Sequence, residues 1–173
     1  MIARLHQAVL RAHDQSARRR NISHDAVILS AIGSGDYSKS VMAALSTIGG
    51  IHAPLAETYD LLIQGGRQQA TQYLQVGKRI PGWGNAFHKG EPDPLWQEVD
   101  AWIKIIHPSI YLLIEQMTAM LHEHKKLIFP NPSCYTAATG IILGYTRQTT
   151  GQLFIEGRLA AWADIFKEHT RCL

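Results

Sequence analysis

The stretch that decides the fold is residues 21–57, "NISHDAVILSAIGSGDYSKSVMAALSTIGGIHAPLAE". Its apolar residues recur at helical spacing, and pairs of glycines separate the runs. Asp36 is a favoured N-cap for a helix over "YSKSVMAALSTI", and Gly49 and Gly50 are expected to end that helix. Pro54 suits the first turn of the next helix, "PLAETYDLLIQ", which Gly65 and Gly66 are expected to stop. The stretch therefore predicts short helices joined by glycine turns.

Helical periodicity continues on both sides of this stretch. Ile2, Leu5, Val9 and Ala12 share one face of a basic N-terminal helix that is expected to pack on the core. Further helices are predicted over 95–106, from Pro108 to about 125, over 134–145 and over 151–169. No run shows the period-two alternation of a strand, so the chain is predicted to be one all-α domain over residues 1–173.

The composition excludes several classes of function. No apolar run reaches the roughly 18 residues of a membrane span, and no secretory signal is apparent. The chain has two cysteines, which form no disulfide framework, so we expect a cytoplasmic protein. A net charge of +3 is too small to indicate nucleic-acid binding. His122 and His124 lie two apart, which is poor spacing for metal ligands on a helix, so no metal site is expected.

Three loops contain residues that could have a function. His52 stands in a glycine-rich turn before a helix, where a neutral imidazole could bind a carbonyl oxygen; a plain turn histidine is equally consistent. The loop "RIPGWGNAFHKGEPDP", residues 79–94, could enclose a flat ring or could be a structural loop pinned by Trp83. A second proline-rich loop leads to Ser133, which is expected to cap the following helix.

Taken together, these segments resemble the citrate synthase superfamily, which includes citryl-CoA lyase modules. The resemblance rests on residues 21–57, "IPGWGNAFHKGEPDP", "FPNPSCYTAATGIILG" and "FIEGRLAAW", which stand in family order between residues 17 and 168. It implies the all-α citrate-synthase-like fold without the N-terminal half of that family. It also implies a homodimer, since the segments 36–48 and 54–64 correspond to the family's dimer-forming helices.

The resemblance also implies a set of catalytic positions. His52 matches the histidine that stabilises the enol of an acyl-CoA thioester. The second histidine, which polarises a 2-oxo acid, is replaced by Asn85, and the proton-abstracting aspartate is replaced by Ser133. An asparagine carries no proton at neutral pH, and a serine is no base without an activating partner. Ordinary citrate synthesis is therefore not expected.

The binding positions that the resemblance implies are partly kept. The family loop contacts coenzyme A (CoA) largely through its main chain. This chain keeps the loop residues Pro81, Gly82, Trp83 and Gly84. The cations Lys78, Arg79 and Lys89 lie beside them in the sequence. On the substrate side, the family's acidic and histidine positions fall on Ala17–Arg20, and an expected arginine falls on Leu95. The remaining candidates for substrate binding are Arg18, Asn21, His88 and Arg158.

Three hypotheses follow from the sequence. The first is a domain that binds CoA or an acyl-CoA with ordinary catalysis lost or strongly reduced. The second is an altered enzyme, such as an acyl-CoA or citryl-CoA lyase or a thioesterase, with His52 as oxyanion donor and His88 or Asp93 as a new base. The third is a structural homodimer without a ligand.

Overall fold

A computed structural model describes residues 1–49, 53–124 and 126–171 of the chain. The described residues are helical with long connecting loops, and they contain no strand, only an isolated bridge between Trp83 and Pro130. The helical elements are α1 (Ile2–Ala17), α2 (Ile22–Ser34), α3 (Tyr37–Leu45), α4 (Leu55–Asp60), the π-helix η1 (Leu61–Gly65), α5 (Gly66–Gln75), the 3₁₀ turn η2 (Pro94–Trp96), α6 (Gln97–Ile106), α7 (Pro108–Glu123), α8 (Pro132–Ile142) and α9 (Gly151–Thr170). The prediction of an all-α fold is confirmed.

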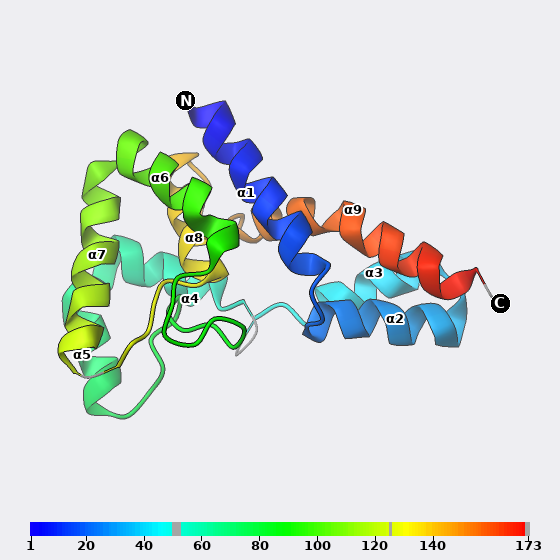
Figure 1. Ribbon diagram of the computed structural model, residues 1–173, viewed down its shortest axis with the longest axis horizontal. Helices are drawn as coiled ribbons and strands as arrows, with labels where there is room; N and C mark the ends of the chain where they lie inside the picture. The colour runs from blue at the N-terminus through cyan, green and yellow to red at the C-terminus, as the bar shows by residue number, and fades with distance from the viewer. Residues whose placement is uncertain (50–52, 125, 172–173) are drawn as a thin grey trace.

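The helices form two groups with α1 between them (Figure 1). One group contains α4 to α8, and the other contains α2, α3 and α9. We call these the loop lobe and the terminal lobe. Each lobe has its own hydrophobic cluster, and that of the terminal lobe includes Val27, Phe154 and Trp162. Helix α1 contacts α9 on one side and α6 and α8 on the other, so it holds the lobes together.

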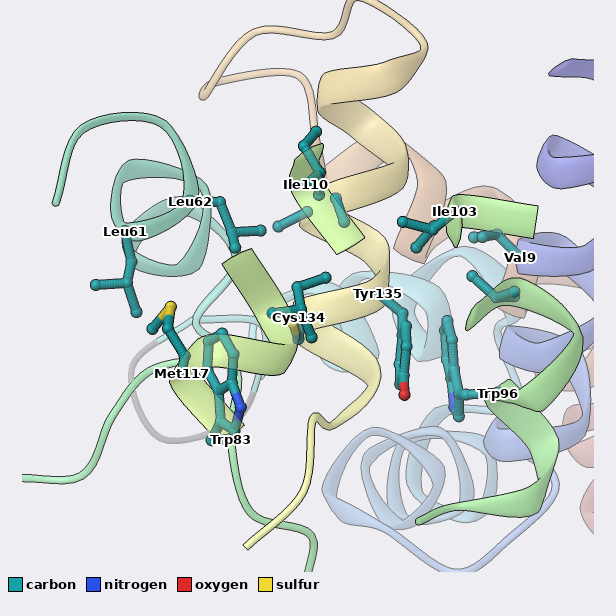
Figure 2. Packing of buried hydrophobic residues seen from close by; sticks show 14 of the residues in the cluster. Val9, Leu61, Leu62, Trp83, Trp96, Ile103, Ile110, Met117, Cys134 and Tyr135 are labelled. Carbon is teal, nitrogen blue, oxygen red and sulfur yellow. The ribbon is translucent and has the colours of Figure 1, made fainter. Parts of the chain in front are cut away.

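Helix α8 lies in the interior of the loop lobe, and most of its own residues are small. All eight residues from Ser133 to Gly140 are buried, as expected of a helix enclosed by its neighbours. The Tyr135 ring stacks on Trp96 with ring centroids 5.7 Å apart, beside Val9 and Ile103 (Figure 2). The packing of these side chains fixes α8 against α1 and α6.

Helix α1 packs on the core through the predicted face, with one exception. Leu5, Val9 and Ala12 are buried, whereas Ile2 in the first turn is 54% exposed. Near the middle of the crossing with α9, a Cβ added to Gly157 would lie 2.4 Å from the Cβ of His13. The absence of a side chain at Gly157 is therefore what lets the two helices approach this closely.

Local capping explains some of the element boundaries. The Asp36 side chain accepts a hydrogen bond from the Lys39 N–H at 2.9 Å, which confirms the predicted cap. Pro54 precedes α4 as its N-cap instead of lying in its first turn, so that predicted boundary was wrong by one residue. The helical run that passes through η1 ends at the glycine pair as predicted, because Gly66 caps it with a φ of +43° where α5 begins.

Candidate binding site

The two proline-rich loops are joined by backbone hydrogen bonds. The Gly84 N–H donates to the Phe129 carbonyl and the Asn131 N–H donates to the Gly82 carbonyl, each at 2.9 Å. Gly82 has a φ of +86°, and a Cβ there would lie 2.5 Å from Thr58. Only glycine satisfies both the conformation and the close approach. We call residues 79–94 the Trp83 loop.

Asn131 couples this loop pair to α8. Its side-chain oxygen accepts from the Ser133 N–H at 2.9 Å, while its Nδ2 donates to the Gly84 carbonyl at 2.9 Å. Asn131 is therefore the N-cap of α8, and the prediction that Ser133 caps this helix was wrong. An asparagine suits this position because it is both an acceptor for the helix and a donor to the loop.

Trp83 pins the loop to the core. Its side chain is 6% exposed, and its Nε1–H donates to the Thr118 hydroxyl at 3.0 Å. Figure 2 shows the indole beside Met117 and Cys134 in the core of the loop lobe. The structural interpretation of this tryptophan is thus the one that the packing supports.

A cavity of about 400 Å³ lies beside the Trp83 loop and is lined by Lys78, Arg79, Lys89 and Lys126. We call it the cationic cavity. Among the residues that the structure describes, none of these four side chains has an ion-pair partner. Unpaired cations around one hollow are suited to bind phosphate oxygens. Sequence reasoning missed Lys126, although the basic run before the second loop is visible in the sequence.

A second cavity, of about 350 Å³, lies between the lobes. Its walls include Asn21 and Arg158 from the terminal side, and Ser133 and the Trp83 loop from the other side. We call it the interlobe cavity. It shares four lining residues with the cationic cavity: Arg79, Gly84, Asn85 and Ala86. The two hollows therefore adjoin the same part of the Trp83 loop.

The structure brings the predicted positions together only in part. Asn21, Asn85, Ser133 and Arg158 line the interlobe cavity, and Lys78, Arg79, Trp83, Gly84 and Lys89 line the cationic one. Pro81 and Gly82 line neither, but they shape the loop. His52 lies outside the described residues; the residues that follow it, Ala53 and Pro54, line the interlobe cavity.

Arg158 is a buried cation without a carboxylate partner among the residues that the structure describes. Its side chain is held by Ser23 Oγ at 3.1 Å and Ser16 Oγ at 3.4 Å, and its Nε has no partner there. The residue is 3% exposed, and burial lowers the pKa of its guanidinium to about 10. A buried charge without an opposite charge costs stability; the Phe154 ring, whose centroid lies 4.0 Å from the guanidinium carbon, offsets part of that cost, and a bound anion would offset more. Arg158 is therefore suited to meet a carboxylate in this cavity.

The side chains of Arg18 and His88 are bound to other residues of the protein. Arg18 pairs with Asp14 and Asp164 on the exposed side of α1. His88 Nε2 accepts from the Arg19 guanidinium at 2.9 Å, which leaves its Nδ1–H to donate to Glu91 at 3.2 Å. Neither residue lines the cavities described above. The basic residue that does approach the site is Arg19, 3.5 Å from the buried carboxylate of Asp93.

Ser133 lies in the interlobe cavity without an activating group. Ser133 is 6% exposed, and its backbone N–H donates to the Asn131 side-chain oxygen. No side chain among the described residues hydrogen-bonds the Ser133 hydroxyl. A serine becomes a nucleophile or base only through such a partner. In the same residues no group of three or more His, Cys, Asp or Glu side chains could hold a metal ion, and no helix is long and apolar enough to cross a membrane.

Comparison with known proteins identifies the class of fold. No family model and no curated protein matches the sequence. Among solved structures, a citryl-CoA lyase from Hydrogenobacter thermophilus matches with a TM-score of 0.79 and 19% identity, covering 98% of this chain and 70% of the lyase. Citrate synthase from Thermotoga maritima matches with a TM-score of 0.81 and 20% identity, over 95% of this chain and 48% of the synthase.

A third match is an ATP citrate lyase from Methanosaeta concilii in complex with (3S)-citryl-CoA, with a TM-score of 0.78 and 15% identity. It covers 98% of this chain and 31% of that protein. The chain therefore has the helical fold of these citrate synthase and citryl-CoA lyase structures, as the sequence resemblance predicted. It spans about half of the matched synthase and less than a third of the matched ATP citrate lyase.

Proposed function

We propose that this domain binds CoA or an acyl-CoA and that its ordinary citrate synthase activity is lost or strongly reduced. The observation that carries the proposal is the cationic cavity, where Lys78, Arg79, Lys89 and Lys126 surround a hollow of about 400 Å³ without acidic partners among the described residues. A ligand with several phosphate groups is the kind of molecule that such a hollow suits.

Two of the matched structures support the choice of CoA. The Methanosaeta concilii ATP citrate lyase is in complex with (3S)-citryl-CoA, and that from Methanothrix soehngenii is in complex with citrate and CoA. A CoA thioester also fits the arrangement of the two cavities. Its phosphates would lie among the cations, and its acyl end would enter the interlobe cavity.

The chemistry at the interlobe cavity supports the loss of citrate synthesis. Removing a general base lowers a rate by roughly 10²–10⁴-fold, and Ser133 does not replace a carboxylate in this role. Asn85 donates hydrogen bonds but transfers no proton. Cleavage of a thioester through His52 stays a prediction, since His52 lies outside the described residues, and so does the homodimer.

The experiment is a calorimetric titration with CoA of three proteins. In the first variant, Lys78, Arg79 and Lys89 are all changed to Gln; in the control variant, Arg20, Lys39 and Lys167 are changed to Gln. Both variants lose three positive charges, but the control residues lie away from the cavity. We expect the loop variant to bind CoA about 10- to 100-fold more weakly and the control to bind like the wild type. Equal weakening in both would contradict a specific phosphate site.

A further inference from the structure

The Asn85 carboxamide has a fixed orientation. Its Oδ1 accepts from the Phe87 N–H at 2.9 Å, and its Nδ2 donates to Asp93 Oδ2 at 3.0 Å. A backbone N–H can only donate and a carboxylate can only accept. The opposite orientation of the amide would place its NH₂ group against the Phe87 N–H and its oxygen against the Asp93 carboxylate. Because an amide nitrogen carries two hydrogens, Asn85 keeps one N–H beyond the bond to Asp93.

Asn85 lies in the part of the Trp83 loop that adjoins both cavities. It lines both the cationic cavity and the interlobe cavity. A CoA thioester with its phosphates among Lys78, Arg79 and Lys89 would pass Asn85 where the pantetheine arm ends and the acyl group begins. The second N–H of Asn85 has no hydrogen-bond partner among the described residues, and the residue lines both cavities that such a ligand would occupy.

We propose that Asn85 donates this hydrogen bond to the carbonyl oxygen of a bound acyl thioester, and that Asp93 is the positioning residue that holds the donor in place. The site then distinguishes an acyl-CoA from free CoA. This inference rests on the proposed function and adds to it the chemical group that is recognised. It gives Asn85 a role in thioester recognition that requires no proton transfer.

Asp93 is suited to this positioning role because its own carboxylate is held on several sides. The side chain is 2% exposed and lies 3.5 Å from the Arg19 guanidinium. Its Oδ1 accepts from the Leu95 N–H at 3.1 Å and caps η2. Its Oδ2 is left to accept from Asn85. The carboxylate therefore cannot turn away without losing the cap and the ion pair.

The substitution Asp93→Asn tests this arrangement while keeping the shape and the cap. An asparagine side chain keeps its oxygen on the Leu95 N–H, so its NH₂ group is turned toward Asn85 Nδ2. Two donors then face each other, and the Asn85 carboxamide loses its fixed orientation. Asn85→Leu removes the donor altogether and serves as the second variant.

The probes are acetyl-CoA, S-ethyl-CoA and free CoA, titrated calorimetrically. S-ethyl-CoA has a chain of the same length without the carbonyl oxygen. We expect the wild type to bind acetyl-CoA on the order of 3- to 10-fold more tightly than S-ethyl-CoA, the range for one neutral hydrogen bond. Both variants should bind acetyl-CoA and S-ethyl-CoA equally, so that the preference for the thioester carbonyl is lost. A purely structural role for Asp93 would weaken all three ligands alike.

The outcomes separate this inference from the function on which it rests. Binding of all three ligands by the wild type without preference for acetyl-CoA would overturn the role of Asn85 and leave the CoA site standing. A preference that persists in Asp93→Asn and in Asn85→Leu would overturn it too. If the folded wild type binds none of the three ligands, both the proposed function and this inference fail.

Discussion

His13 and Thr136 are hydrogen-bonded behind the interlobe cavity, with 2.8 Å between His13 Nε2 and Thr136 Oγ1. The Thr136 hydroxyl donates its hydrogen to the Pro132 carbonyl at 2.6 Å. His13 must therefore carry its hydrogen on Nε2 and donate to Thr136. This bond joins α1 to the first turn of α8, the turn that places Ser133 in the cavity.

The state of His13 predicts a pH dependence of stability. Burial, and then the nearby charge of Arg158, lower the pKa of His13 well below its usual 6.5. The folded protein therefore keeps this ring neutral, whereas the unfolded chain takes up a proton as the pH falls below 6.5. The free energy of unfolding should fall by up to about 1.4 kcal/mol per pH unit below that value, and His13 should contribute no pH dependence above it.

Urea unfolding of the wild type and of His13→Gln between pH 7.5 and 5 measures this contribution. The chain has nine histidines, so the quantity to compare is the difference between the two proteins at each pH. The variant should lose less stability than the wild type as the pH falls. Parallel curves for the two proteins would show that His13 is not the group that titrates.

Substitution of Gly157 should disrupt the contact between α1 and α9. A Cβ at Gly157 would lie 2.4 Å from the His13 Cβ and 3.2 Å from the Leu10 carbonyl oxygen. Gly157→Ala should therefore destabilise the protein by about 1–3 kcal/mol, the usual cost of overpacking. The matched control is Gly151→Ala at the start of α9, where nothing lies within 4 Å of an added Cβ. A helix-favouring alanine there should leave stability unchanged or raise it slightly. Equal effects in urea unfolding would refute the close approach.

Replacement of Arg158 should separate binding from stability. Because its buried guanidinium has no carboxylate partner among the described residues, Arg158→Met should leave the ligand-free protein as stable as the wild type or more so. Arg147, which pairs with Asp60 at 2.7 Å on the surface, is the comparison: Arg147→Met should lower stability only slightly, because solvent screens an exposed ion pair. Thermal unfolding measures both. A loss of several kcal/mol in Arg158→Met would mark this arginine as structural.

The same pair of variants tests the anion-binding role of Arg158. Small dicarboxylates should raise the melting temperature of the wild type and of Arg147→Met, because a bound ligand stabilises the folded state by mass action. They should not raise that of Arg158→Met. An equal rise in all three proteins would place the anion elsewhere.

Glycine, proline and capping residues predicted most of the fold. Asp36 and Pro108 each mark a helix boundary that the structure has. The glycine pair at 65 and 66 also ends a helical run, but the π-turn of η1 before it was not predicted, because it depends on packing of Leu61 and Leu62 in the core. Such tertiary packing overrides a local signal and is not visible in the spacing of residues.

The sequence predicted the loops of the site, but not which side chains form ion pairs and hydrogen bonds with one another. The glycines and cations of the Trp83 loop could be read from the sequence, and they line the cationic cavity. That Arg19, and not Arg18, reaches Asp93 depends on where α1 ends and how the chain turns there. Likewise the bond from Asn85 to Asp93 joins residues that face each other only in the folded loop. Hydrogen bonds of this kind are a product of three-dimensional geometry.

The most direct test of the central claim is the titration of the wild-type protein with CoA. The four unpaired cations of the cationic cavity predict micromolar binding that weakens as salt is raised, because the contacts are between charges and phosphates. Folded protein that takes up no CoA at millimolar concentration and low salt would contradict the account.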